Sequence, residues 1–312
     1  MLRLGAPMIF FNILFFLTIN FPDLKEDLDC VEYYAGEGVI CDAFRYFGKA
    51  AEKWDIRYDE VNQNALLAEG FLHQVALGKR LKRRKGLGTW GTVCSSWVFM
   101  SRSGTGRSGM RPLGFEDRQP VMAGNMMVCR MCLILLFFYA TARHWLLEQP
   151  GTSIMKRAPW PRFLWSQLQV RFTHTWMCMF GGETMKSIEL ASGSKWTLAL
   201  HRTRDTEKDH QWQAISGVRH EAPNADGRIR VSGHSGLKGS QEYPPRFGFA
   251  IAKEFLINGG CDEDIDIWMD EATEIDWATW QRANSEVDWS YANFGDIAEF
   301  LEIPADQPMR QF

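Results

Sequence analysis

The sequence is poor in cysteine, and its few cysteines fit neither a disulfide-stapled protein nor a zinc protein. There are seven, an odd number, and most lie scattered in apolar stretches, which favours reduced thiols in a reducing compartment. Cys129 and Cys132 have the spacing of half a metal site, but no second pair and no histidine cluster follow them. A structural zinc takes four ligands, so we interpret the pair as buried thiols and predict no metal.

The chain lacks the GxxxxGK[ST] phosphate loop, and it lacks a dinucleotide-binding fingerprint in the required position. Such a fingerprint, GxGxxG, has to follow a strand and open a helix, so that the backbone can approach phosphates closely. The letters GxGxxG occur at 86–91 and 104–109, but the first run lies within an expected strand and the second within an expected loop. The sequence therefore argues against a dinucleotide site and against a phosphate-loop site.

Charge is distributed unevenly along the chain. The formal net charge is -3, yet residues 262–312 hold 14 Asp/Glu and only two arginines, a local balance of -12. The rest of the chain has 33 Lys/Arg against 24 Asp/Glu, a balance of +9. A basic body is compatible with a polyanionic partner, because clustered Lys and Arg release counterions from a phosphate backbone.

The N-terminal segment is strongly apolar over residues 8–21, MIFFNILFFLTINF, and follows Arg3. It is shorter than the roughly 20 residues that span a bilayer comfortably, and no small-x-small cleavage site follows it. Three interpretations remain open: a signal or membrane anchor, a buried helix, and a wrongly assigned first exon. The reduced cysteines favour an intracellular location, for which the nucleus is the preferred site.

Residues 30–150 alternate between expected strands and helices. Strands are expected at residues 30–36, 50–56, 87–93 and 144–148, and helices at 39–47, 64–85 and 125–143. This alternation predicts an α/β fold of the Rossmann-like type, with a mostly parallel sheet flanked by helices on both faces. In such sheets, ligands bind outside the carboxyl ends of the strands.

The expected organisation has three parts. Residues 1–29 form the apolar segment and a linker, residues 30–260 form the domain with an irregular polar insert at 190–241, and residues 261–312 form an acidic, tryptophan-rich tail. The tail could shield the basic body, dock a protein partner through its aromatic side chains, or pack on the domain itself.

The run from Glu32 to Gly38, EYYAGEG, joins an expected strand to a helix through a glycine turn. Such a turn lets a ligand approach the backbone at a helix N-terminus. Asp55 follows Gly36 by nineteen residues at the end of the next strand. This is about the offset at which an acid binds ribose hydroxyls in Rossmann-like sites, although both could be ordinary turn residues.

The same run resembles the first motif of the cytosine-5 DNA methyltransferases. In that motif an acidic residue, two apolar or aromatic residues and Ala-Gly-x-Gly line the cofactor. The resemblance implies a methyltransferase fold that binds S-adenosylmethionine. The cofactor-binding residues that it implies are Glu32, Tyr34, Ala35, Gly36, Gly38 and Asp55.

Two further runs resemble motifs of this family. VCSSW is similar to the Pro-Cys loop, with Cys94 in the place of the nucleophile and Val93 in the place of the proline. EQP is similar to the Glu-Asn-Val motif, which implies that Glu148 lies at the target base. The mobile Ser/Arg-rich loop after Cys94 would close over the base, and its candidates for nucleic-acid contacts are Ser96, Arg102 and Arg107.

The chemistry of the family gives these residues a purpose. A thiolate that adds to cytosine C6 makes C5 nucleophilic, which is covalent catalysis. Glu148 would stabilise the added state at ring N3, and the base would be flipped out of its stack to reach the pocket. The resemblance therefore implies methyl transfer to cytosine C5 in nucleic acid, with DNA favoured over RNA.

The resemblance covers about residues 30–150, with an echo in EYPPRFGFAIAKEF. The family's Arg-x-Arg strand is not visible after Glu148, and the polar insert is short for a target-recognition domain. A catalytically inactive descendant that binds nucleic acid or protein therefore remains an alternative, as does an interaction protein anchored at a membrane. In either case Cys94 and Glu148 would be structural residues.

Overall fold

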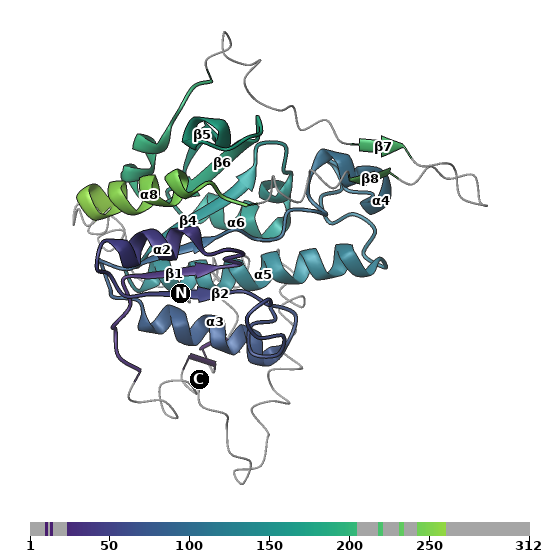
Figure 1. Ribbon diagram of the computed structural model, residues 1–312. Coiled ribbons are helices and arrows are strands. Elements are labelled where there is room, and N and C mark those ends of the chain that lie inside the picture. Colours follow the sequence, from purple (N-terminus) through teal and green to yellow (C-terminus); the bar gives the residue numbers. More distant parts are fainter. Residues whose placement is uncertain are drawn as a thin grey trace.

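The computed structural model describes residues 10–11, 13–14, 24–204, 218–220, 231–233 and 242–259 (Figure 1). The acidic tail from 261 to 312, most of the apolar segment and most of the insert after residue 204 lie outside these residues. The predictions made for those parts of the chain stay predictions.

A six-stranded sheet forms the centre of the molecule, in the order β2-β1-β3-β4-β6-β5. β1, β2, β3 and β4 are parallel, whereas β6 runs antiparallel to both of its neighbours. The strands are β1 (Cys30–Tyr33), β2 (Ala51–Trp54), β3 (Leu87–Trp90), β4 (His144–Pro150), β5 (Arg171–Trp176) and β6 (Ser187–Ser192). The predicted α/β class with a mostly parallel sheet is confirmed.

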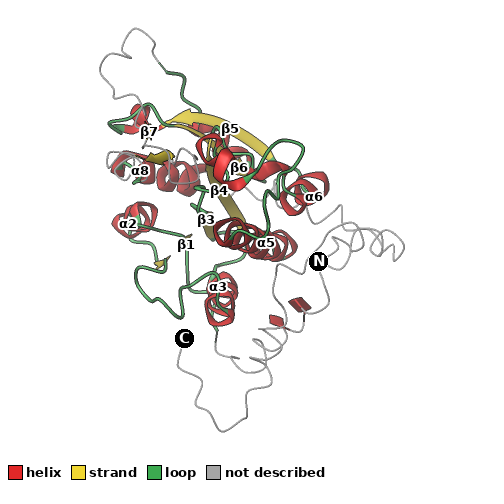
Figure 2. Cartoon of the chain, turned by 90° about the vertical axis from the view of Figure 1, so that its right-hand side faces the viewer, coloured by secondary structure: helices red, strands yellow, loops and turns green. Residues whose placement is uncertain are grey.

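Helices cover both faces of this sheet, as predicted (Figure 2). One face carries α3 (Ala68–Arg80), α5 (Gln119–Ala140) and α6 (Pro159–Gln167), and the other carries α2 (Val39–Tyr46) and α8 (Pro245–Glu254). Every residue of β1 and β3 is buried, as expected for strands with helices on both sides. Each face has its own large apolar cluster.

Shorter elements complete the described chain. 3-10 turns lie at Phe99–Ser101, Met155–Arg157, Met177–Phe180 and Lys195–Leu200, α4 spans Arg102–Thr105, and a π-helical turn at Phe255–Gly259 extends α8. β7 (Val218–His220) and β8 (Val231–Gly233) form a separate antiparallel pair. The expected irregular insert is thus partly ordered, because its first residues belong to β6 and to the turn after it.

α5 is apolar on all sides, and this composition explains its position. It is long and apolar enough to cross a membrane, and it is the one such helix among the described residues. A helix that is apolar all round is either a membrane span or a core element. In this structure 78% of its most apolar 18-residue stretch is buried inside the protein. The apolar side chains of α5 are therefore covered by the rest of the described chain.

The helix boundaries differ from the sequence-based expectation at α3 and α5. α3 was expected over 64–85, but residues 64–67 form a turn in which the Asn64 side chain accepts the N–H of Leu66. At the other end, Leu81 is extended and the Lys82 N–H binds the Leu28 carbonyl. α5 was expected from 125 and begins six residues earlier, with a proline in its first turn.

The described part of the N-terminal segment lies against the core. Phe10 and Ile13 are fully buried, and the Phe10 ring stacks on Phe71 of α3 at 6.2 Å. Such contacts are what the buried-helix interpretation of this segment predicts. The other residues between 8 and 21 lie outside the described chain.

The direction in which the chain adds strands to the sheet reverses between β1 and β3, and this place is called the topological switch point. The chain leaves β1 through α2 to reach β2 on one side, and returns through α3 to β3 on the other side. Ligands of open α/β sheets bind in the crevice where the order reverses, at the carboxyl ends of the strands. The glycine turn follows β1, the Cys94 loop follows β3, and Glu148 lies near the end of β4.

Candidate functional site

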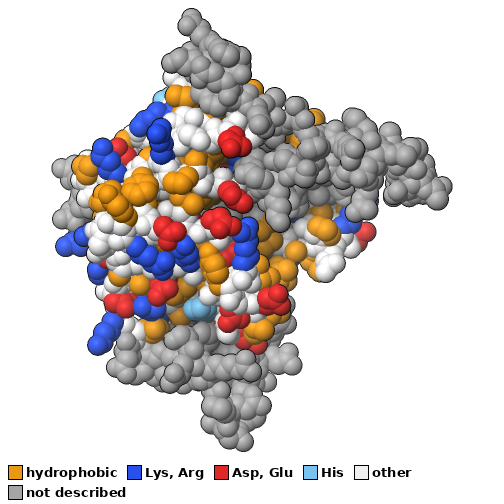
Figure 3. Space-filling model, in the orientation of Figure 1, with side chains coloured by type: hydrophobic (Ala, Val, Ile, Leu, Met, Phe, Trp, Pro, Cys, Tyr) orange, Lys and Arg blue, Asp and Glu red, His pale blue; other side chains and the backbone are white. Residues whose placement is uncertain are grey.

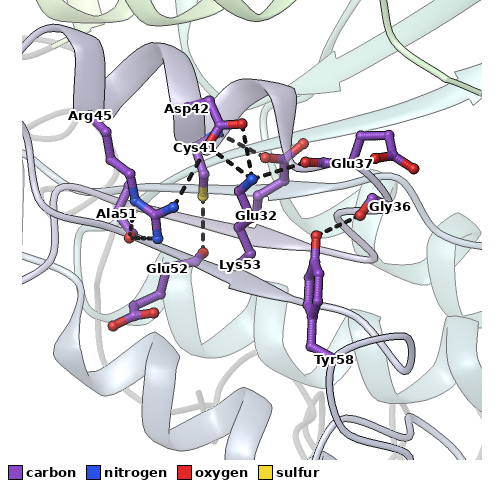
Figure 4. Close-up of polar contacts among 10 residues, drawn as sticks. All are labelled: Glu32, Gly36, Glu37, Cys41, Asp42, Arg45, Ala51, Glu52, Lys53 and Tyr58. Carbon is purple, nitrogen blue, oxygen red and sulfur yellow. Dashed lines mark hydrogen bonds and ion pairs between the residues drawn. The ribbon is translucent and has the colours of Figure 1, made fainter.

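The turn after β1 has a backbone that favours glycine. The φ angles of Tyr34, Gly36 and Gly38 are +57°, +56° and +75°. A Cβ at Gly38 would also lie 2.2 Å from the Cδ of Lys53, so a side chain at Gly38 has neither the conformation nor the space it needs. Lys53 instead crosses the turn and donates to the Glu37 carbonyl (Figure 4).

Asp55 holds this turn from the end of the neighbouring strand. Its Oδ2 accepts the N–H of Gly36 at 2.9 Å, and its Oδ1 accepts the N–H of Arg57 at 3.0 Å. The structure thus brings together the two residues that the nineteen-residue spacing paired. Nearby, Tyr58 donates its hydroxyl to the Gly36 carbonyl (Figure 4), so the turn is fixed from several sides.

Glu32 lies on β1, and its buried carboxyl group reaches the first turn of α2. Its Oε2 accepts the N–H of Cys41 at 2.8 Å, while its Oε1 is buried and has no hydrogen-bond partner (Figure 4). Burial raises the pKa of Glu32 to about 7, although the backbone N–H groups of Cys41 and Ile40 act in the opposite direction. Burying a carboxyl oxygen without a hydrogen-bond partner costs folding free energy. A ligand that donated a hydrogen bond to Oε1 would reduce this cost.

Glu32 is expected to make stability depend on pH. Its pKa rises on folding from 4.5 to about 7, so its contribution to stability is complete below pH 4.5 and is lost as the pH rises through 7. The loss is at most about 3.5 kcal/mol, at about 1.4 kcal/mol for each pKa unit. Glu32→Gln should therefore flatten the dependence of unfolding free energy on pH between pH 5 and 8, measured by urea denaturation.

The matched control for this measurement is Glu37→Gln. The side chain of Glu37 lies in the same turn but is 57% exposed, so the control should retain the pH slope of the wild type. An equal slope in the wild type and in Glu32→Gln would contradict the prediction.

A small cavity of about 10 Å³ lies at the switch point. It has room for about one water molecule. Glu32 from β1 and Thr89 from β3 are among the lining residues that have a buried side-chain oxygen without a hydrogen-bond partner. The cavity is lined by Glu32, Tyr34, Ile40, Thr89, Trp90, Gly91, Leu146, Glu148, Tyr243, Phe247 and Ile251.

Glu148 is the centre of a polar cluster at one end of this cavity. Its Oε2 accepts the hydroxyl of Tyr243 at 2.9 Å, and its Oε1 forms an ion pair with Lys186 Nζ at 3.5 Å. Both charged side chains are largely buried, at 9% and 13% exposure. A buried charge pair with few hydrogen bonds contributes little to stability. Stabilisation of the fold therefore explains this cluster less well than a functional role does.

Cys94 lies in the electrostatic field of this cluster. Burial raises the pKa of the Cys94 thiol, the charge of Glu148 raises it further, and the charge of Lys186 lowers it. The thiol form of Cys94 is therefore favoured, first by burial and then by the charge of Glu148, which the charge of Lys186 partly offsets.

Tyr243 and Lys186 were not among the residues predicted from the sequence. Tyr243 lies in EYPPRFGFAIAKEF, the run that echoes the family's last motif, so a signal for this region existed but pointed to no single residue. Lys186 directly precedes β6, the antiparallel strand. Nothing in the sequence pattern pairs this lysine, which precedes the insert, with Glu148.

The loop after Cys94 differs from the expectation of a mobile, solvated segment. Arg107 is 1% exposed, its guanidinium donates to Asn125 and Ser96, and it lies 3.4 Å from the centre of the Trp97 ring. Ser96 is also buried. In this conformation both side chains are directed into the protein, and their assignment to nucleic-acid contacts stays a prediction.

Arg102 is the third residue predicted for nucleic-acid contacts. It is half-buried, and its guanidinium packs over the Phe99 ring at 4.7 Å. On the face of the molecule that Figure 3 shows, the described Lys and Arg side chains are interspersed with Asp and Glu. The excess of basic residues in the body therefore does not appear on this face as a continuous basic surface.

Comparison of the chain with known proteins identifies no relative. No family model matches the chain, and neither a curated protein nor a solved structure matches it. Among the described residues, no group of three or more His, Cys, Asp and Glu side chains is placed to hold a metal ion.

Proposed function

We propose that the protein is an S-adenosylmethionine-dependent methyltransferase that acts on C5 of cytosine in nucleic acid, with DNA favoured. The observation that carries the proposal is the meeting of two sets of residues at one switch point. The glycine turn tied to Asp55 lies at the end of β1, and the Cys94–Glu148 environment lies at the ends of β3 and β4. One set resembles a cofactor site, and the other resembles a site for covalent catalysis.

The residues of the turn suit the proposed cofactor in their chemistry. The unpartnered Oε1 of Glu32 and Oγ1 of Thr89 provide buried polar atoms at the cavity, and the absence of side chains at Gly36 and Gly38 would let a ligand approach the backbone once Lys53 moves away from the turn. When bound, S-adenosylmethionine supplies a methyl group on a sulfonium centre. A cavity of about 10 Å³ does not hold such a molecule, so binding requires the site to open.

The catalytic proposal assigns separate roles to Cys94 and Glu148. The Cys94 thiolate would form a bond to C6, and the electron pair of the C5–C6 double bond would become available at C5. A protonated Glu148 would donate to ring N3, and its other oxygen would accept from the neighbouring amino group. After methyl transfer, loss of the C5 proton would restore the double bond as the bond between sulfur and C6 breaks.

Calorimetry of S-adenosylmethionine binding to the full chain tests the first half of the proposal. We expect micromolar affinity in the wild type and a loss of at least about tenfold in Asp55→Ala, since each lost hydrogen bond to a charged group is worth about 1.5–3 kcal/mol. Glu60→Gln, an exposed acid five residues further on, is the matched control and should bind as the wild type does. Absence of binding in the wild type would contradict the proposal.

A non-catalytic binding module is the second candidate function. Two observations favour it: the raised pKa of Cys94 favours the less nucleophilic thiol form, and the Tyr243 hydroxyl already donates to Glu148. Under this hypothesis the chain binds nucleic acid or a protein, and Cys94→Ser changes no measurable activity. In one form of this hypothesis, the apolar residues 8–21 anchor the protein at a membrane. Two of these residues, Phe10 and Ile13, are buried in the domain.

A further inference from the structure

Three exposed aromatic side chains meet where α2 packs against α8. Tyr46 is the last residue of α2, Phe47 follows it, and Phe249 lies on α8. The ring centres of Tyr46 and Phe47 lie 5.1 Å and 6.0 Å from that of Phe249, and 5.5 Å from each other. The residues are 74%, 39% and 37% exposed, respectively. We call these three residues the α2–α8 patch; exposed apolar side chains that gather in this way mark interaction sites.

Basic side chains lie at the edge of the α2–α8 patch. Arg246 lies three residues before Phe249 and Lys253 four residues after it, so all three lie on one side of α8. Lys49 follows Phe47 by two residues. The three cations are exposed. Figure 3 shows hydrophobic side chains gathered over α2 and α8, with Lys and Arg side chains beside them.

The acids of the two helices do not neutralise these cations. Asp42, the acid of α2, pairs with Arg45 and Lys53. Glu254, the acid of α8, is half-buried and accepts the side-chain N–H of Asn258. The ion pairs among the described residues therefore leave the three cations at the edge of the patch available.

The chain that follows α8 has the complementary composition. Residues 262–312 have a local charge balance of -12. They also contain tryptophans beside acids, in the near-repeats EIDW at 274–277 and EVDW at 286–289. An aromatic side chain flanked by carboxylates matches a surface that has rings at its centre and cations at its edge, since rings pack on rings and opposite charges attract.

This segment also begins close enough to reach the patch. Gly259 ends the π-helical turn that extends α8, and Phe249 lies ten residues before it, about 15 Å back along the helix at 1.5 Å per residue. Trp268 follows Gly259 by nine residues, which can span up to about 30 Å. Trp268 and every later tryptophan are therefore within reach of the patch.

We infer that the α2–α8 patch is the docking surface for the acidic, tryptophan-rich segment 261–312 of the same chain. Tryptophan rings of this segment pack on Tyr46, Phe47 and Phe249, and its carboxylates lie beside the cations at the edge. Of the three roles that the sequence left open for this segment, the inference selects packing on the domain itself. It requires neither a cofactor nor nucleic acid, so it is independent of the proposed function.

Photocross-linking of the full chain tests which segment contacts the patch. With p-benzoylphenylalanine in place of Phe249, irradiation in dilute solution should join position 249 to a peptide from 261–312, in a product with the mass of one chain. Phe99 is the matched control position, because its ring is 63% exposed and also lies beside an arginine, Arg102. Cross-links from position 249 to a second copy or to other segments alone, or equal cross-linking of 261–312 from position 99, would overturn the inference.

Proteolysis of the full chain tests the charge complementarity. Arg282 lies between the two near-repeats, and docking should protect it from trypsin. Reversal of two charges in Arg246→Glu/Lys253→Glu should speed cleavage after Arg282 by at least about fivefold, because cleavage follows the population of the undocked state. Lys85→Glu/Arg162→Glu, at two exposed cations elsewhere, should cleave as the wild type does. Equal cleavage rates in the two double variants would show that the patch does not bind this segment.

Discussion

Cys94→Ala is expected to reduce methyl transfer to cytosine by roughly three orders of magnitude or more, the scale on which removal of a nucleophile acts in other covalent enzymes. The reason is that a thiolate must add to C6 before C5 becomes reactive. Cofactor affinity should stay within about twofold of the wild type, because Cys94 is not one of the turn residues that we assign to the cofactor. Transfer of a radiolabelled methyl group to a cytosine-containing duplex measures the first quantity, and calorimetry measures the second.

The control for this variant is Ser95→Ala, an exposed neighbour in the same loop, which should transfer methyl groups as the wild type does. The raised pKa of Cys94 adds a readout that needs no turnover, because alkylation by iodoacetamide should accelerate as the pH rises through the thiol pKa. Glu148→Gln should shift that acceleration to lower pH, and Lys186→Met should shift it to higher pH. Unchanged methyl transfer in Cys94→Ala would refute the covalent proposal.

Arg107→Met is expected to lower the free energy of unfolding by about 1–3 kcal/mol, the cost of leaving buried neutral acceptors without a donor. The guanidinium donates to the carbonyls of Pro112 and Val121 and to the side chains of Asn125 and Ser96. Methionine fills a similar volume but leaves these acceptors unsatisfied in a buried site. Urea denaturation measures the loss of stability.

The same variant should expose the loop that Arg107 holds. Limited proteolysis of the native protein is expected to cut between residues 98 and 118 at a faster rate in Arg107→Met. Arg111→Met is the matched control, because Arg111 is an exposed arginine in the same loop that packs over the Phe115 ring at 5.0 Å. Equal urea midpoints for the two variants would show that the network around Arg107 does not stabilise the fold.

The first βαβ unit could be predicted from the sequence because its signals are local. Glycines at positions 36 and 38 mark a turn with positive φ, and the apolar face of residues 39–47 marks the following helix. The spacing from Gly36 to Asp55 is also a local signal, since one strand, one turn and one helix separate them. Short-range patterns therefore sufficed to place half of the candidate site.

The rest of the site depends on contacts between distant positions, which composition does not encode. The Ser/Arg-rich loop looked mobile because nothing in its sequence shows that Arg107 would find four acceptors and the face of Trp97. Likewise, the sequence named no partner for Glu148, because Lys186 and Tyr243 lie 38 and 95 positions away from it. Such partners become visible only when the sheet order is known.

The boundaries of α3 show a third limit. The basic run KRLKRRK suggested that the helix continues to residue 85, because lysine and arginine are favourable near a helix C-terminus. Instead, Arg80, Lys82 and Arg83 pair with Asp27, Asp29 and Glu26 of the linker before β1. The acids of the linker thus pair with basic side chains that could otherwise have extended the helix. This pairing could not be recognised before the contact between the two segments was known.

The packing of α8 against α2 has a consequence for synthesis of the chain on the ribosome. Gly248 approaches the Val39 carbonyl so closely that a Cβ would lie 2.5 Å from it, and Phe44 contacts Phe255. Domains begin to form while the C-terminal part is still being made, so the apolar side of α2 stays uncovered until about 200 further residues have been added. The nascent chain must therefore hold an aggregation-prone surface through most of translation, and closing so long a loop makes completion of the fold slow.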